Sequence, residues 1–84
     1  MKFILSKTVY KHLDNLPKKV VENIYEHFKE LAKGSSNLDI KKLYPRETYR
    51  LRIGDYRAIY SINKEKNFIE ILKVQHRKDI FKRK

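Results

Sequence analysis

The sequence YRLRIGDYRAIY, residues Tyr49–Tyr60, predicts a β-hairpin. Apolar and polar residues alternate on both sides of Gly54-Asp55, which is the period-two pattern of strands with one buried face. A two-residue loop with glycine first suits a type II′ turn, and such a loop fixes the strand register. Arg52 is therefore expected directly opposite Arg57. Like charges in that position destabilise a sheet, so the pair needs a functional or structural reason.

Two helices are predicted before the hairpin. Ser6 is placed to cap the first helix, and Pro17 either ends that helix or opens the second one. Apolar residues at helical spacing continue over residues 18–33. Gly34 is placed to stop this second helix in a left-handed cap.

Short strands complete the expected fold. Residues 2–5 are apolar enough for an opening strand, and residues 68–74 (FIEILKV) predict a last strand after a polar turn. Residues 34–47 are predicted as a loop pinned to the core by a few apolar side chains. The chain, residues 1–84, is then a single α+β domain. Two antiparallel N-terminal helices pack on a small, mainly antiparallel sheet of three to four strands.

The composition indicates a polyanionic partner. The chain has 21 Lys and Arg against 10 Asp and Glu, a formal charge of +11. Such an excess favours binding to nucleic acid, an anionic membrane face or an acidic protein. A lysine-rich, solvated surface is the alternative interpretation. The N-terminus has too few consecutive apolar residues for a signal peptide or a membrane span, which predicts a soluble, cytoplasmic protein.

Metal and cofactor sites are not expected. The chain has no cysteine, and its three histidines lack the spacing of metal ligands. It has only two glycines, so neither a glycine-rich phosphate loop nor a nucleophile elbow is present. Glu22, Glu26 and Glu30 form an acidic stripe at helical spacing, which is typical of a solvated helix face.

Arginine is concentrated on the hairpin. Only six of the 21 cations are arginine, yet Arg50, Arg52 and Arg57 all fall within this short stretch. The planar guanidinium binds phosphate through two parallel hydrogen bonds and does not lose its proton. This placement favours a phosphodiester site. The alternative is structural: Asp39, Asp55 or Glu70 neutralises the patch, or the guanidiniums splay into water.

The blocks YRLRIGDYRAIYSI (49–62) and IEILKVQHRKDIF (69–81) resemble the RelE group of the RelE/ParE toxin superfamily. The likeness extends over nearly the whole chain as an order of elements and is strongest over residues 49–81. The resemblance implies the toxin of a bacterial or archaeal toxin–antitoxin pair. RelE-type members enter the ribosomal A site and cleave the bound mRNA, using the 2′-hydroxyl of the message as the nucleophile.

The resemblance also implies site residues. The basic positions of the family's first hairpin fall on Arg50, Arg52 and Arg57, and the arginine after the last strand falls on Arg77. Arg57, Arg52, Arg77 and His76 are assigned to catalysis, and Arg50, Lys78 and Phe81 to RNA binding. The first choice for stabilising the phosphate transition state is Arg57.

The position of Phe81 departs from the family pattern, which has a tyrosine there. Phenylalanine lacks a hydroxyl, although its ring can still stack on a base. Tyr10, Tyr44 or His76 is then a candidate for the missing group, and the sequence identifies no certain general acid or base.

The functional prediction is a ribosome-dependent mRNA endonuclease without a cofactor, held inactive by a RelB-like antitoxin. Two rivals stay open at this stage. The first is a ParE-like toxin that acts on DNA gyrase, and the second is a basic nucleic-acid-binding module without catalytic activity.

Overall fold

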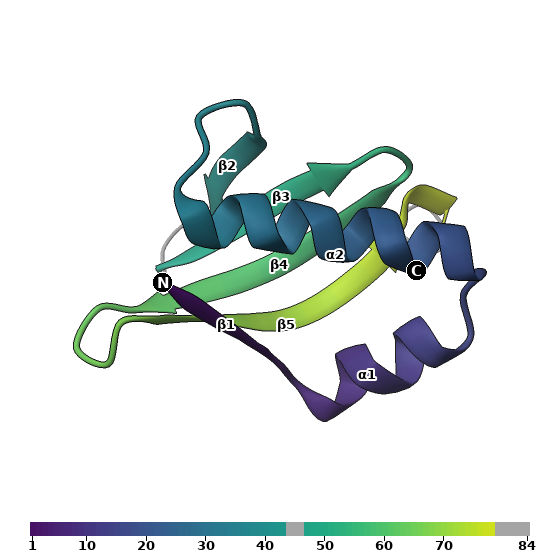
Figure 1. Cartoon of the computed structure of the whole chain (residues 1–84), viewed down its shortest axis with the longest axis horizontal. Coiled ribbons are helices and arrows are strands. Elements are labelled where there is room, and N and C mark those ends of the chain that lie inside the picture. The colour runs from purple at the N-terminus through teal and green to yellow at the C-terminus, as the bar shows by residue number, and fades with distance from the viewer. Residues whose placement is uncertain (44–46, 79–84) are drawn as a thin grey trace.

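The computed structural model describes residues 1–43 and 47–78. Two helices pack on a five-stranded sheet whose strand order is β1-β5-β4-β3-β2 (Figure 1). The elements are β1 (Lys2–Leu5), α1 (Lys7–Asp14), α2 (Lys18–Lys33), β2 (Asp39–Leu43), β3 (Thr48–Ile53), β4 (Tyr56–Asn63) and β5 (Phe68–His76). β1 runs parallel to β5, and the other neighbours are antiparallel. The predicted α+β class with two helices on a mainly antiparallel sheet is confirmed.

α2 begins and ends as the sequence predicts, and α1 begins at the predicted cap but ends at Asp14, before Pro17. The Ser6 side-chain oxygen accepts a hydrogen bond from the Val9 N–H at 3.3 Å and caps α1. Pro17 opens α2, in the extended conformation of a residue that precedes a helix. Gly34 ends α2 with a φ of 79°, the left-handed conformation that glycine adopts without strain.

The predicted loop over residues 34–47 is wrong in part, because Asp39–Leu43 forms β2. This strand pairs with β3 at the edge of the sheet, and four of its five residues are exposed. An exposed strand needs no apolar face, and its sequence, DIKKL, lacks the apolar alternation that marks a half-buried strand. Main-chain pairing with β3 forms the strand instead. The sheet consequently has five strands rather than three to four, and β5 also runs two residues beyond the predicted end at Val74.

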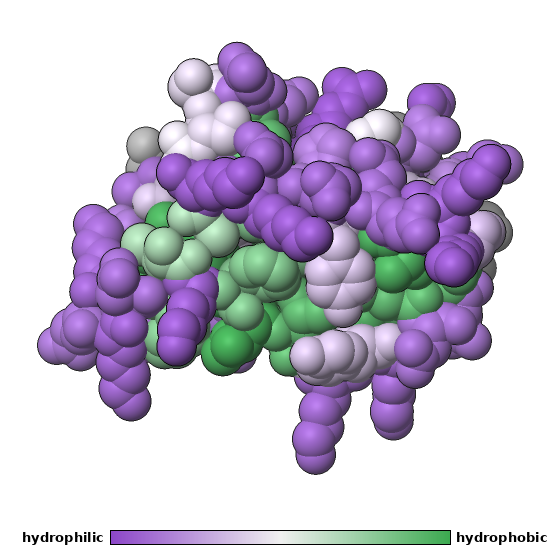
Figure 2. Space-filling model, in the orientation of Figure 1, coloured by the Kyte–Doolittle hydropathy of each residue, from purple (hydrophilic) through white to green (hydrophobic). Residues whose placement is uncertain are grey.

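The core lies between the helices and one face of the sheet. α1 packs against β5, and α2 packs against β1 and β3 (Figure 1). Figure 2 shows an apolar band on this side of the molecule, framed by hydrophilic side chains. The largest fully buried side chains are Phe28, Ile24, Leu51, Ile53, Ile71 and Val9. Burial of each such side chain contributes about 1.5–3 kcal/mol, so this layer holds the hairpin in place.

Over the described residues, neither helix has the length and apolar character needed to cross a membrane.

Candidate functional site

The hairpin has the register that its turn predicts. Arg52 pairs with Arg57 across β3 and β4, and Ile53 pairs with Tyr56 next to the turn. Gly54 adopts a positive φ of 57° at the first turn position, whereas the second turn residue does not have a positive φ. This is the pattern of a type II′ turn. The two guanidiniums therefore start from directly opposed backbone positions.

The two faces of this hairpin differ in burial and in residue type. Leu51, Ile53 and Ala58 point toward the helices and are at most 1% exposed. Because side chains alternate along a strand, Arg52 and Arg57 belong to the opposite, open face of the sheet. Arg52 is exposed and Arg57 is half-buried. Packing on the helix face thus fixes the backbone that carries the arginines.

The helix face of the hairpin also holds a stacked pair of tyrosine rings. The ring centroids of Tyr49 and Tyr60 lie 5.3 Å apart with an interplanar angle of 19°. Burial, with a smaller electrostatic contribution from Tyr49, raises the pKa of Tyr60 to about 12. The phenol of Tyr60 is therefore kept neutral in the folded protein well above neutral pH.

Three arginines converge on one pocket at the turn end of the hairpin. The pocket has a volume of about 250 Å³. It is lined by Arg52, Gly54, Asp55, Tyr56, Arg57 and Arg77. The structure thus brings together three of the four residues that the sequence analysis assigned to catalysis. They come from β3, β4 and the residue that follows β5.

Arg77 reaches the pocket through two contacts with the turn. Its main-chain N–H donates a hydrogen bond to the carbonyl oxygen of Asp55 at 2.8 Å. Its guanidinium Nη1 lies 3.8 Å from the Oδ1 atom of Asp55. The main-chain bond continues the β4–β5 pairing one step past Tyr56 and His76, which are direct partners. The end of β5 is therefore held against the hairpin turn.

Arg50 lies on the same face as Arg52 but in a different environment. Its Nη2 is 4.0 Å from the Oδ1 atom of Asp39 on β2, and its side chain is 23% exposed. The Nε atom of Arg50 is buried and has no hydrogen-bond partner within the described part of the chain. Asp39 thus faces Arg50, as the structural alternative expects, whereas Asp55 faces Arg77, which lies outside the hairpin. Over residues 1–43 and 47–78, however, Arg52 and Arg57 have no ion-pair partner.

His76 lies beside the pocket without lining it. Its ring packs edge-on against the ring of Tyr56, with centroids 4.9 Å apart. Its Nδ1 accepts a hydrogen bond from the main-chain N–H of Lys78 at 3.0 Å. In the neutral ring this leaves the proton on Nε2. Lys78 itself is exposed and lies outside the pocket lining.

The remaining predicted residues are dispersed or outside the described ranges. Phe81 and Tyr44 both fall outside the described residues. Tyr10 is 55% exposed on α1 and does not line the pocket. The described residues contain no group of histidine, aspartate and glutamate side chains that could hold a metal ion.

Asp55 and Tyr56 line the pocket, although the sequence analysis assigned no chemistry to them. From the sequence, Asp55 is a turn residue and a candidate counter-charge, and Tyr56 is a residue of the buried face. Their adjacency to the predicted turn was the available signal. Their place in the pocket depends on Arg77, whose approach to the turn could not be read from strand periodicity.

Comparison with known proteins assigns the family. Residues 3–81 match the sequence profile described as "ParE toxin of type II toxin-antitoxin system, parDE". A comparison with curated protein sequences found no match.

Solved structures resemble the chain over nearly its whole length. An archaeal RelE-RelB complex from Pyrococcus horikoshii shares 34% identity, with a TM-score of 0.77 and coverage of 90% of this chain and 93% of the other. A RelB-RelE antitoxin-toxin complex from Methanococcus jannaschii shares 29%, with a TM-score of 0.76 and coverage of 93% and 94%. A toxin-antitoxin complex from Mycobacterium tuberculosis shares 27%, with a TM-score of 0.77 and coverage of 89% and 95%.

The fold, the arginine pocket and these matches agree with the resemblance seen in the sequence. The chain belongs to the RelE/ParE superfamily and is a toxin of the type II toxin–antitoxin class.

Proposed function

We propose that this toxin is a ribosome-dependent mRNA endonuclease of the RelE type. The observation that carries this proposal is the direct pairing of Arg52 with Arg57 at the edge of a pocket that Arg77 also lines. Such a pairing opposes folding, because two cations of the same sign face each other. A backbone phosphate between the two guanidiniums would replace this repulsion with charge-assisted, bidentate hydrogen bonds.

The arginines have separate parts in the proposed reaction. The 2′-hydroxyl of the message attacks the adjacent phosphorus, and negative charge builds on the phosphate oxygens. Arg57 stabilises that charge, assisted by Arg52 and Arg77. Electrostatic stabilisation of charge that develops in the transition state is usually the largest single contribution to catalysis. Losing one such group typically lowers the rate by about 10²–10³.

The other assigned residues would hold the RNA or the leaving group. Arg50 would anchor the RNA backbone farther from the turn than Arg52 and Arg57. Its ion pair with Asp39 limits the movement of its side chain. Lys78 and Phe81 extend the RNA contact beyond β5. His76 serves the leaving 5′-oxygen through Nε2, the ring atom that carries the proton when Nδ1 accepts from Lys78.

The proposed partner in the cell is a RelB-like antitoxin. Three structural relatives were solved as toxin–antitoxin complexes, two of them of RelE with RelB. A formal charge of +11 favours an acidic partner that folds on binding and covers the basic surface. The toxin would act in the cytoplasm, where its substrate, mRNA in the ribosomal A site, is found.

A ParE-like activity against DNA gyrase is the second candidate, because the matching family profile carries the ParE description. The two activities have different readouts. Programmed ribosomes with a labelled mRNA report cleavage, and a supercoiling assay reports gyrase inhibition.

The deciding experiment compares both assays with the purified toxin and with toxin co-expressed with the protein encoded by the neighbouring reading frame. We expect cleavage of A-site mRNA by the toxin alone, no cleavage of an mRNA with a 2′-deoxy nucleotide at the cut site, and no effect on gyrase. Gyrase inhibition without RNA cleavage would support the ParE-like activity and reject the endonuclease. If the toxin stays active and still arrests growth when it is co-expressed with the neighbouring protein, the antitoxin proposal is rejected.

A further inference from the structure

A carboxylate lines the arginine pocket, and phosphate binding alone does not explain it. Of the six lining residues, Asp55 is the one that carries a negative charge. Its Oδ1 atom lies 3.8 Å from the guanidinium of Arg77. A negative charge beside a bound phosphate weakens binding of the substrate. The Asp55 carboxylate therefore opposes phosphate binding in this pocket.

The fold does not require this carboxylate. The Asp55 side chain is 66% exposed, and an ion pair between exposed groups contributes little to stability. Arg77 is also tied to Asp55 by a main-chain hydrogen bond of 2.8 Å, which any residue at position 55 would accept. Asparagine is as well suited to a turn as aspartate. Neither the turn nor the placement of the Arg77 backbone explains the charge.

We infer that Asp55 is the general base of the proposed reaction and takes the proton of the attacking 2′-hydroxyl. This inference rests on the proposed endonuclease function and supplies the base that the sequence analysis could not identify. The arginines and the carboxylate share one pocket of about 250 Å³, so a phosphate held by Arg52 and Arg57 shares this space with Asp55. The 2′-hydroxyl is attached to the carbon next to the one that carries this phosphate, which places it within the same pocket.

The proposed step balances as follows. The 2′-hydroxyl proton moves to the Asp55 carboxylate, the bond between the 2′-oxygen and phosphorus forms, and the bond between phosphorus and the 5′-oxygen breaks. The products are a 2′,3′-cyclic phosphate and a 5′-hydroxyl. The leaving 5′-oxygen receives its proton from Nε2 of His76 or from water. The protonated Asp55 returns its proton to water.

The test is single-turnover cleavage of mRNA on programmed ribosomes by the full chain. Asp55→Asn keeps the shape of the side chain and removes its basicity, and we expect the rate to fall by about 10²-fold. Asp55→Ala should lose as much, and added formate should restore part of its rate by replacing the missing carboxylate. The matched control is Glu65→Gln, which changes an exposed acid in the turn at the other end of β4. Its rate should stay within a factor of about three.

The outcomes separate this inference from the proposed function. A wild-type protein that cleaves, with Asp55→Asn equally fast or faster, would show that the carboxylate is only a counter-ion and would overturn the inference alone. A slow Asp55→Asn with an Asp55→Ala variant that formate does not rescue would also overturn it. A wild-type protein that cleaves no mRNA would reject the proposed function, and the inference with it.

Discussion

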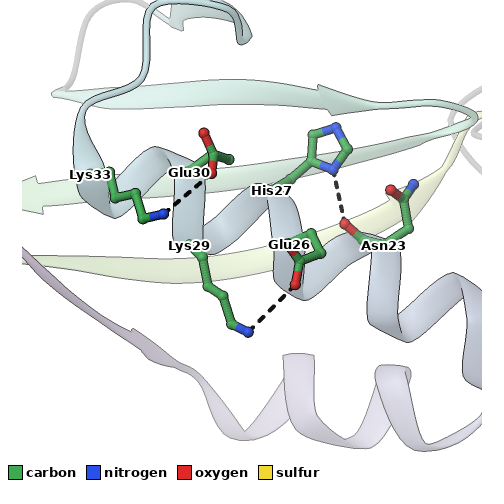
Figure 3. Close-up of polar contacts among 6 residues, drawn as sticks. All are labelled: Asn23, Glu26, His27, Lys29, Glu30 and Lys33. Carbon is green, nitrogen blue, oxygen red and sulfur yellow. Dashed lines mark hydrogen bonds and ion pairs between the residues drawn. The ribbon is translucent and has the colours of Figure 1, made fainter.

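On the outer surface of α2 the charged side chains sit beside opposite charges, whereas on the β3–β4 hairpin they face like charges. Lys29 pairs with Glu26 at 3.5 Å and Lys33 pairs with Glu30 at 3.7 Å, both at the i, i+3 spacing. Figure 3 shows the two pairs along the helix. Each pair stabilises a helix by a few tenths of a kcal/mol. The hairpin instead places Arg52 opposite Arg57.

This difference separates charges that serve stability from charges that serve a ligand. The α2 pairs are exposed and follow the helix rule, as the sequence predicted for a solvated acidic stripe. The hairpin arginines break the corresponding rule for sheets. Asp39 faces Arg50, whereas Arg52 and Arg57 have no ion-pair partner among residues 1–43 and 47–78. Departures from local rules without a local gain are expected at functional sites.

The largest effect is expected for Arg57→Ala. Removing one fixed cation at the phosphate should lower single-turnover mRNA cleavage on programmed ribosomes by about 10²–10³. The control is Lys29→Ala, which removes an exposed cation that is paired with Glu26 on α2. This variant should cleave at the wild-type rate. Equal activity of Arg57→Ala and wild type would remove Arg57 from the catalytic set.

The next largest effect is expected for His76→Ala. If His76 serves the leaving oxygen as proposed, its loss should slow cleavage by about 10²-fold, the usual size of an acid–base contribution. His27→Ala is the matched control, because the His27 ring on α2 bonds the carbonyl oxygen of Asn23 in its own helix (Figure 3). A His76→Ala rate within a factor of about three of wild type would leave this residue with a packing role against Tyr56.

A third prediction concerns the helix face of the same hairpin. Because burial raises the pKa of Tyr60 to about 12, folding keeps this phenol neutral where the unfolded chain ionises it. Its contribution to stability is complete below about pH 10 and is lost as the pH rises toward 12. The free energy of unfolding should therefore fall by about 2 kcal/mol more in wild type than in Tyr60→Phe over that interval.

Urea unfolding of both proteins at pH 9 and pH 11.5 measures this difference. Parallel losses of stability in the two proteins would show that Tyr60 is not the group responsible.

The smallest effect is expected for Glu26→Gln on α2. It removes one exposed i, i+3 ion pair and should lower stability by about 0.2–0.5 kcal/mol, or about 1–4 °C in melting temperature. Cleavage should be unchanged. A loss of cleavage in this variant would mean that the acidic stripe is more than a solvated face.

The parts of the fold that could be predicted are those in which side-chain burial sets the pattern. The hairpin register follows from Gly54 and the alternation around it, and both helices follow from Ser6, Gly34 and an apolar stripe. β2 could not be predicted, because its exposed residues carry no periodicity and main-chain pairing alone forms it. Edge strands of this kind are determined by the neighbouring strand.

The same limit applies to the site. The opposition of Arg52 and Arg57 follows from the turn and was predictable. A register shift between Ile59 and Tyr60 sets how β5 aligns with β4, and hence which residue reaches the turn. The 2.8 Å bond between Arg77 and Asp55 depends on that alignment, so the sequence indicated that Arg77 belongs to the site only through the family resemblance.

The central claim is that the Arg52–Arg57 pair is unfavourable in the free protein and is stabilised by a phosphodiester. Its most direct test is the melting temperature of wild type and Arg57→Ala, measured with and without a non-cleavable, 2′-O-methylated RNA oligonucleotide. Without RNA, Arg57→Ala should melt at the same temperature as wild type or slightly above it, because a like-charge pair is relieved. With RNA, wild type should gain stability and the variant should gain far less. A variant that melts markedly lower without RNA, or that gains as much as wild type with it, would contradict the claim.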